Sequence, residues 1–526
     1  MRRCYRYLFT VFLLLLWFGV ILVTSCERKA HVRASAEQCR EMGRPARIYP
    51  EYYDVTIPPN IAPLNFVVRE TGSYYYVKIY SEHEQAIEIG SRSPKIVIPH
   101  KAWYRLLNMN RGQQLRFDVF VKAREDQWQQ FSTIVNEIAD ENVDGYVAYR
   151  KIEPAHSIWK TMGIYQRDLY DFDESCIVDN GQFRDGCVNC HSFCNNRTDR
   201  MLIGIRSPLY GSSALLAEDD AVKKIGTKFG YTSWHPSGRL AAYSINNIRL
   251  FFHSARSEVR GVVDLDSLLA YYLVESRTAK TAAKISDKNR LETYPAWSAD
   301  GRWLYFCSAP IPWSDRHQVP PENYDQVKYD LVRVGYDLDS DSWGELETVL
   351  SAKQTDQSIL LPRISPDGRW LLFCMCDYGS FPVYHRSSDL YMIDLESAEQ
   401  TGRYEYRKLE INSDESESWH SWSSNSRWIA FSSKRRSGVF TRIYLSYVDR
   451  EGKVAKPLLL PQKDPTYYDS CLWTYSVPEL VTEPVRVEGE RLARVVRGSQ
   501  EIRVDLPITM ATPSVAPSTE PWQQRE

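Results

Sequence analysis

Two cysteines and a histidine lie within five positions of one another and could together hold a single cofactor. Residues Cys187 to His191 read Cys-Val-Asn-Cys-His. Two thiols at this spacing can add to the two vinyl groups of one haem, and the imidazole that follows can bind its iron. The sequence therefore predicts one haem c, with thioether bonds from Cys187 and Cys190 and with His191 as the proximal iron ligand.

The same residues leave other interpretations open. Cys176 and Cys194 flank the motif, so one or two disulfides among these four cysteines are an alternative in an exported chain. A structural zinc site that uses the cysteines and His191 is a second alternative, and an iron–sulfur cluster is a third. In the haem interpretation, Cys176 and Cys194 would pair with each other.

The sixth ligand of the iron has four candidates. A thioether from Met162 or Met201 would raise the reduction potential, whereas His253 or His420 would supply a second imidazole. Each of the four also has a structural interpretation, as a methionine in a β core or a hydrogen-bonded histidine at a blade edge. An open sixth position would leave room for a small ligand or a peroxide.

The N-terminus has the pattern of a bacterial lipoprotein signal. Three arginines precede an apolar run over residues 8–23, and small residues then lead directly into Cys26. This pattern predicts lipidation of Cys26, which becomes the mature N-terminus and attaches the protein to the membrane. The alternative is an uncleaved membrane anchor. Since Glu27 follows the cysteine, we expect an outer-membrane lipoprotein that faces the periplasm or the cell surface.

Composition narrows the class of protein. The chain has 526 residues, of which 43% are hydrophobic and 13% aromatic, and its formal net charge is −2. Nucleic-acid binding requires a clustered excess of Lys and Arg, so we expect no nucleic-acid partner. Aromatic residues favour strands, and the composition therefore indicates an all-β fold.

A turn motif repeats through the second half of the chain. Its copies begin at Trp234, Trp297, Ile364 and Trp422, which are 63, 67 and 58 residues apart. The copy over residues 364–370 reads Ile-Ser-Pro-Asp-Gly-Arg-Trp, a tight turn that precedes an apolar strand. One such hairpin per period, with further strands between, is typical of a β-propeller blade, and the motif resembles the TolB-like, WD40-like repeat.

Fainter signals extend the repeat at both ends and suggest about six blades. Residues 192–205 could open a first blade, and residues 468–477 could open a last one. Alternating strands before residue 150 predict a β-sandwich-like domain, closed by a helix over 128–140. The predicted organisation is a signal peptide (1–26), a tether (27–45), the sandwich-like domain (46–150), a linker (151–186), the propeller (187–480), and a C-terminal extension with a disordered tail (481–526).

The order of these segments resembles a known group of proteins. Met162-Gly163-Ile164-Tyr165-Gln166-Arg167 and Asp171-Phe172-Asp173-Glu174-Ser175-Cys176 precede the haem motif, and the TolB-like turns follow it. Over about residues 45–480, the chain resembles exported cytochrome c-like, TolB-like propeller proteins of Bacteroidetes-type bacteria. The resemblance implies a haem and a propeller, and it implies no particular activity.

Three functions follow from these patterns. The first is a haem protein for electron transfer or redox sensing, with a redox or envelope protein as its partner. The second is a non-catalytic propeller that binds a protein or a glycan. The third is an enzyme similar to oligogalacturonate lyase-like propellers, with a divalent metal held by His235, His253 and His420.

Overall fold

The chain forms two compact units. The computed structural model describes residues 39–123, 127–153, 161–184, 186–219, 221–253 and 260–504. Within this range, residues up to Asp140 and Pro461–Ser470 form the first unit, and the remaining residues form the second. No helix in the described ranges is long and apolar enough to cross a membrane. Cys26, the signal segment and the predicted tail from residue 505 onward lie outside the described residues.

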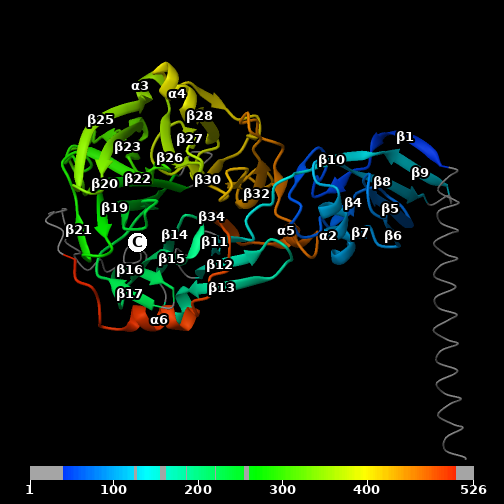
Figure 1. Cartoon of the computed structure of the whole chain (residues 1–526), viewed down its shortest axis with the longest axis horizontal. Helices are drawn as coiled ribbons and strands as arrows, with labels where there is room; N and C mark the ends of the chain where they lie inside the picture. Colours follow the sequence, from blue (N-terminus) through cyan, green and yellow to red (C-terminus); the bar gives the residue numbers. More distant parts are fainter. Residues whose placement is uncertain are drawn as a thin grey trace, which may run out of the picture. The chain divides into compact units, whose positions relative to one another are not determined.

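The second unit is a six-bladed β-propeller, which confirms the predicted fold class (Figure 1). Each blade is a four-stranded antiparallel sheet, and the first strands of successive blades contact one another around the axis. Five blades are contiguous in sequence. Their strands are β14 (Cys187–Cys194), β15 (Arg197–Ser207), β16 (Gly211–Glu218) and β17 (Ala221–Ile225); β18 (Thr232–Trp234), β19 (Leu240–Phe252), β20 (Arg260–Leu273) and β21 (Thr278–Lys280); β22 (Arg290–Trp297), β23 (Trp303–Pro310), β24 (Asp330–Asp337) and β25 (Ser342–Leu350); β26 (Ser358–Ile364), β27 (Trp370–Cys376), β28 (Asp389–Asp394) and β29 (Tyr406–Lys408); and β30 (Glu417–Trp422), β31 (Trp428–Ser433), β32 (Arg442–Tyr447) and β33 (Leu458–Leu459).

The sixth blade joins the two ends of the propeller sequence. Its strands are β11 (Tyr146–Ile152), β12 (Met162–Asp168), β13 (Glu174–Asp179) and, on the inner side of β11, β34 (Thr474–Val481). The prediction of a linker over 151–186 was therefore wrong, because this segment supplies two outer strands of a blade. The domain boundary lies at Asp140, ten residues before the predicted one. Strands β11 to β13 lack the turn motif by which four of the other blades were recognised.

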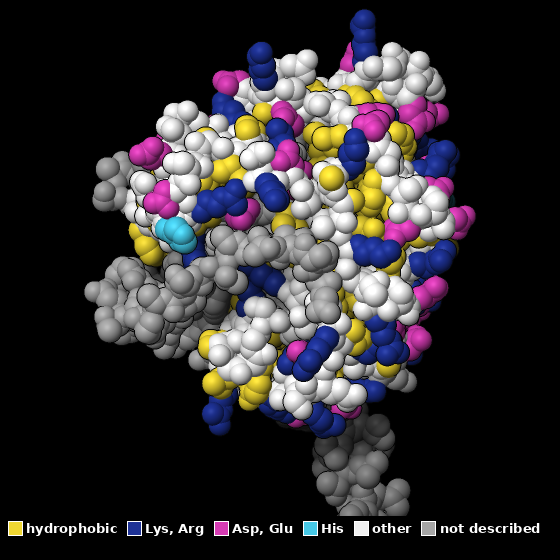
Figure 2. All heavy atoms as spheres, turned by 90° about the vertical axis from the view of Figure 1, so that its left-hand side faces the viewer, with side chains coloured by type: hydrophobic (Ala, Val, Ile, Leu, Met, Phe, Trp, Pro, Cys, Tyr) yellow, Lys and Arg dark blue, Asp and Glu magenta, His cyan; other side chains and the backbone are white. Residues whose placement is uncertain are grey.

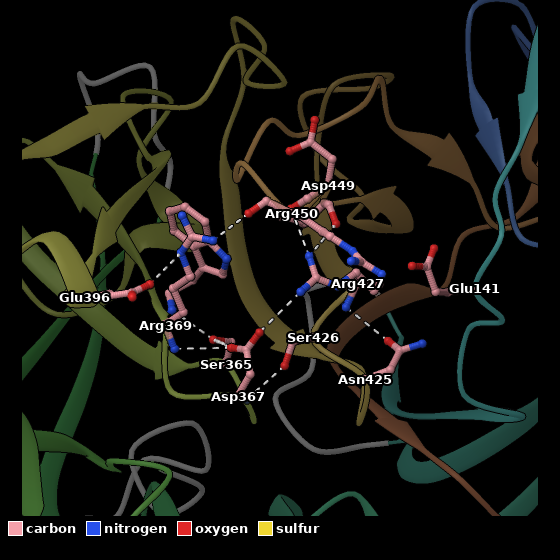
Figure 3. Close-up of polar contacts among 12 residues, drawn as sticks. Glu141, Ser365, Asp367, Arg369, Glu396, Asn425, Ser426, Arg427, Asp449 and Arg450 are labelled. Atoms are coloured by element: carbon pink, nitrogen blue, oxygen red, sulfur yellow. Dashed lines mark hydrogen bonds and ion pairs between the residues drawn. The ribbon is translucent and has the colours of Figure 1, made fainter. Parts of the chain in front are cut away.

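The repeated turn motif contacts the neighbouring blade as well as closing its own hairpin (Figure 3). In the copy between β26 and β27, Ser365 donates to Asp367 at 2.5 Å, and Gly368 adopts a φ of 80°. From the next blade, Arg427 Nη2 lies 3.4 Å from Asp367, and Ser426 Oγ accepts from the Asp367 amide at 2.9 Å. A single short motif thus fixes both the hairpin and the spacing between blades.

The first unit contains two sheets, as a sandwich-like domain requires. Phe66 of one sheet stacks on Phe117 of the other, with 5.9 Å between ring centroids. The larger sheet contains β1 (Arg40–Pro45), β3 (Thr56–Ile57), β5 (Tyr74–Tyr80), β6 (Ile87–Ser91), β8 (Gln114–Lys122), β9 (Trp128–Ser132) and β10 (Ile134–Ile138); the smaller contains β2 (Ile48–Tyr49), β4 (Phe66–Val68) and β7 (Lys95–Ile96).

Two sequence predictions for this unit were wrong. Residues 128–140 form strands β9 and β10 rather than a helix, and burial along β10 alternates with the period of a strand. The longer helix of this unit is instead α2 (His100–Met109), whose buried Trp103 donates to the Ile61 carbonyl at 3.1 Å. The end of the predicted tether is strand β1, which pairs in parallel with β9.

The propeller has a few short helices outside its blades, and the last of these, α6 (Gly489–Arg497), packs into its hydrophobic core. Helix α6 places Leu492 and Val496 against Phe183 and Met201, in a hydrophobic cluster between the last blade and the β14 blade. The predicted C-terminal extension is therefore packed structure as far as this helix. The helices after α2 are α3 (Ala352–Thr355), α4 (Leu395–Thr401), α5 (Tyr467–Ser470) in the first unit, and α6 (Gly489–Arg497).

Candidate cofactor site

The Cys-Val-Asn-Cys-His motif lies on β14, the innermost strand of its blade. The strand pairs with β15, and its first residue, Cys187, lies opposite Arg206. The pairing register shifts between Asn189 and Ser192, so Cys190 and His191 leave the ladder as a β-bulge. Cys190 adopts a φ of 56°, a left-handed conformation that few residues other than glycine accept.

This bulge recurs around the propeller and forms a ring of side chains at the axis. Positive φ values between 47° and 56° occur at Tyr294, Leu361, Trp419 and Val477. Tyr294, Leu361 and Trp419, like Cys190, lie four residues before the turn that closes the first hairpin of their blade, and Val477 lies where the register of β34 against β11 shifts. Tyr231 of the β18 blade occupies the same position, and its ring centroid lies 4.2 Å from that of Tyr294 and 5.7 Å from that of Trp419. We call these six residues the axial ring: Cys190, Tyr231, Tyr294, Leu361, Trp419 and Val477.

The two thiols of the motif share one basic neighbour. Burial raises the pKa of Cys190 to about 11, and the nearby Arg206 guanidinium opposes this rise. Cys187 is buried and interacts with the same guanidinium. Within the described residues, Cys176, Cys187, Cys190 and Cys194 form no disulfide, so the predicted disulfides are absent there. Neither Cys187 nor Cys190 forms a disulfide, and the raised pKa keeps the Cys190 thiol protonated.

The imidazole of His191 is buried and poorly satisfied. His191 is 3% exposed, and neither of its ring nitrogens forms a well-aligned hydrogen bond within the described structure. The backbone of Val477 and Ala148 provides only weaker polar contacts. Burial, together with the charge of Arg150, lowers the pKa of His191 to about 3. The ring is thus neutral at any physiological pH, which is the state in which imidazole binds a metal.

Two partly buried basic side chains, Arg206 and Lys228, lie near the thiols. Burial, and then repulsion by Arg206, lowers the pKa of Lys228 to about 8. Lys228 also faces Asp264, whose own pKa burial raises to about 7. A haem carries two propionate carboxylates, for which buried guanidinium and ammonium groups are suitable partners. The donor set fits a haem c in its chemistry, since it combines two thiols outside any disulfide, a neutral imidazole and two partly buried cations.

The four candidates for a sixth ligand occupy different environments. Met201 packs in the hydrophobic cluster beneath α6. Met162 is buried at the start of β12, and its amide donates to Asn180 at 3.2 Å. His420 Nε2 lies 3.2 Å from the Leu372 carbonyl oxygen, which occupies that nitrogen. His253 lies in an aromatic pocket at the end of β19.

The structure does not assemble the divalent-metal site expected from three histidines. His235 is held by Ser237 at 2.7 Å and by the Gly301 carbonyl oxygen at 3.1 Å, as part of a turn between blades. Among the described residues, no group of three or more His, Cys, Asp or Glu could hold a metal ion. The prediction that His235, His253 and His420 share a metal was wrong, and so was the zinc alternative at the cysteines.

Sequence reasoning missed the basic residues near the motif. Arg206 is isolated among apolar and polar residues, and Lys228 lies only near Lys223 and Lys224, so no local pattern links them to the motif. The pairing of β14 with β15 places Arg206 opposite Cys187. A register assignment for that hairpin, anchored on the turn at Asn195 and Asn196, is the one signal that could have found it.

Comparisons with known proteins support no family assignment. No family model matches the chain, and no curated protein matches it. Among solved structures, it is similar to a luciferin-regenerating enzyme, with a TM-score of 0.35 and 9% identity over 59% of this chain and 91% of that one. It is also similar to an oligogalacturonate lyase from Vibrio parahaemolyticus, with a TM-score of 0.33 and 11% identity over 73% of this chain and 100% of that one. For hydrazine synthase from Kuenenia stuttgartiensis, the TM-score is 0.29 and the identity 13%, over 51% of this chain and 65% of that one. The propeller assignment rests on the six-sheet topology of the chain itself.

Proposed function

We propose that this protein carries one covalent haem c at the propeller axis and acts in electron transfer or redox sensing. Cys187 and Cys190 would form the thioether bonds, and His191 would bind the iron. The observation that carries the proposal is the state of these residues: both thiols are free, and the buried imidazole is neutral without a well-aligned hydrogen bond.

The surrounding residues have definite tasks in this proposal. When bound, the haem supplies an iron that alternates between two oxidation states. Arg206 and Lys228 would hold the propionates by charge-assisted hydrogen bonds. The burial of His191 keeps the imidazole neutral and limits the access of water to it. Aromatic members of the axial ring, such as Tyr231, provide an apolar surround that tunes the potential.

The proposed location agrees with this chemistry. Haem attachment to cysteines takes place outside the cytoplasm, and lipidation of Cys26 would anchor the exported protein at the outer membrane. We propose a redox or envelope protein as the partner and expect no nucleic-acid partner. On the face drawn in Figure 2, basic and acidic side chains are interspersed, whereas nucleic-acid binding favours one continuous basic surface.

The test is a haem assay on matched cysteine variants. The full-length protein is produced with haem-maturation machinery, and haem per chain is measured as the pyridine haemochrome. Wild type should carry one haem, and the double variant Cys187→Ser with Cys190→Ser should carry none. Cys176→Ser, on the neighbouring β13, is the control and should retain it. A wild-type protein without a Soret band would refute the proposal, as would haem retained covalently by the double variant.

A further inference from the structure

A lysine, an asparagine and an aspartate meet within the β18 blade. Lys228 lies just before β18, Asn246 lies on β19, and Asp264 lies on β20. Asn246 and Asp264 are each 3% exposed, and Lys228 is partly buried. The register of β19 against β20 shifts after Asn246, and at this bulge the side chain of Asn246 lies against that of Asp264.

The side-chain amide of Asn246 is held at both of its polar atoms. Its nitrogen Nδ2 donates to Asp264 Oδ2 at 2.5 Å and to Thr293 Oγ1 at 3.2 Å. Its oxygen Oδ1 accepts from Ser244 Oγ at 2.6 Å. Thr293 and Ser244 are fully buried. The amide carbon Cγ is thus fixed between a hydroxyl donor on its oxygen and a carboxyl group on its nitrogen.

The Lys228 amine reaches the same asparagine. Its Nζ donates to the backbone carbonyl oxygen of Asn246, and its charge interacts with that of Asp264. Burial is the main reason that the pKa of Lys228 falls to about 8 and that of Asp264 rises to about 7. Because the two pKa values are close, a proton can pass from the ammonium to the carboxylate at little cost in free energy. The neutral amine that results is a nucleophile.

Gly230 allows the backbone to cover the amide of Asn246. A Cβ atom at Gly230 would lie 2.6 Å from Asn246 Oδ1 and 2.8 Å from Ser244 Oγ, so a larger residue would displace both groups. The chain therefore packs directly against the amide oxygen, where water has little room. Exclusion of water favours attack by the amine over hydrolysis of the amide.

We propose that Lys228 and Asn246 form an intramolecular isopeptide bond, with Asp264 as the acid–base group. Lys228 first gives a proton to Asp264, and its neutral Nζ then attacks Asn246 Cγ. As the new C–N bond forms, an electron pair moves to Oδ1, where the hydrogen bond from Ser244 stabilises the negative charge.

The bond is completed by loss of ammonia. Asp264 gives its proton to Asn246 Nδ2, the Cγ–Nδ2 bond breaks, and the electron pair on Oδ1 restores the carbonyl group. The extra proton on Nζ passes to the released ammonia, which leaves as ammonium. Asp264 ends as the carboxylate that accepted the first proton, and the reaction consumes no oxidant or other reactant.

The isopeptide bond goes beyond the proposed haem function and does not require a haem. Its three residues are separate from the cysteine motif, and no step of the reaction uses iron. A cross-linked Lys228 is neutral, so in the proposed haem site the propionates would then rely on Arg206.

Tryptic peptide mapping of the full-length chain, produced without haem-maturation machinery, tests the proposal. Trypsin cleaves after Lys224, Lys228, Arg239 and Arg249 in the unmodified chain, but it does not cleave at an acylated lysine. The cross-linked chain should therefore release a branched peptide in which residues 225–239 are joined to residues 240–249. Its mass should be that of the two peptides less one ammonia.

Three variants assign the roles. Lys228→Arg cannot form the bond and should release residues 240–249 as a separate peptide. Asp264→Asn should do the same, because it removes the group that moves the protons. The control Lys223→Arg, on the neighbouring β17, should retain the branched peptide. Circular dichroism checks that each variant is folded, and the wild-type map by itself decides whether the bond exists.

Three results would overturn the proposal. The first is a wild-type map in which residues 225–228 and 240–249 appear only as separate peptides of unmodified mass. The second is loss of ammonia from residues 240–249 with normal cleavage after Lys228, which would show a succinimide at an asparagine instead of a cross-link. The third is a branched peptide that persists in folded Asp264→Asn, which would refute the role of Asp264.

Discussion

Replacing Gly301 by alanine should destabilise the propeller through its contact with His235. Gly301 has a φ of 74°, and a Cβ there would lie 2.2 Å from His235 Nε2. Gly368 occupies the same turn position one blade later, with a φ of 80°, but a Cβ there would meet only the Ala299 Cβ at 3.4 Å. Comparing alanine variants of these two glycines separates the free-energy cost of the backbone conformation from that of the steric contact.

The two variants should lose different amounts of unfolding free energy, and the difference is the cost of the steric contact with His235. A left-handed conformation costs a residue with a Cβ roughly 1–2 kcal/mol, and forcing an atom into packed surroundings costs about 1–3 kcal/mol more. Unfolding entropy of about 2.1 cal/mol/K per residue makes each kcal/mol worth about 1.4 °C in Tm for a unit of roughly 350 residues. Gly301→Ala should lower Tm by about 3–7 °C and Gly368→Ala by about 1.5–3 °C.

Scanning calorimetry measures both shifts, and a third variant identifies the cause. In a His235→Ala background, adding Gly301→Ala should cost no more than Gly368→Ala does in wild type, because the clashing ring is gone. Equal Tm losses for the two glycine variants would refute the steric argument. A rise in the wild-type Tm on adding zinc, lost in His235→Ala, would show that His235 binds metal instead of spacing the blades.

Three further predictions concern titration and thiol reactivity. Burial raises the pKa of Glu292 to about 8, so the stabilisation from its protonated form is present below pH 4.5 and is lost as the pH rises through 8. The variant Glu292→Gln should therefore show a flatter dependence of Tm on pH between these values. An unchanged slope would contradict the assignment. The hydrogen bond from Arg44 lowers the pKa of Glu70 to about 2, so the stabilisation from the ionised carboxylate is present above pH 4.5 and is lost as the pH falls through 2. The variant Glu70→Gln should remove this loss of stability at low pH from the first unit. Acid melting curves that superimpose on those of wild type would count against it. Burial, with Asp179 nearby, raises the pKa of Cys176 to about 12. At pH 8, iodoacetamide should therefore alkylate Cys176 more slowly than it alkylates the thiol of glutathione, and mass spectrometry can follow both reactions. A faster reaction at Cys176 would show that its thiol is not perturbed.

The sequence alone was sufficient for the blades that carry the turn motif. A Gly that follows Asp or Ser in a tight turn before an apolar strand is expected to take a positive φ, and Gly238, Gly301 and Gly368 all do so. The closing blade was harder to find. Strand β34 joins strands that lie more than 300 residues away in the chain, and only the three-dimensional pairing of β11 with β34 shows this.

The candidate site was predictable in part. The spacing of Cys187, Cys190 and His191 is local and could be read directly. Their position on an innermost strand depends on which strand of the blade comes first, and the bulge at Cys190 becomes clear only by alignment with Tyr294 and Trp419 in other blades. The aromatic pocket could not have been predicted, because three loops of irregular length and no common motif supply its residues.

The haem assignment has one direct test, on a single peptide. Trypsin cleaves after Arg184 and Arg197 and releases residues 185–197, which contain Cys187, Cys190, His191 and Cys194. From cells that make haem c, the account predicts this peptide with the mass of one added haem and with alkylation at Cys194 alone. A peptide without haem, in which all three cysteines react with the alkylating agent, would contradict it.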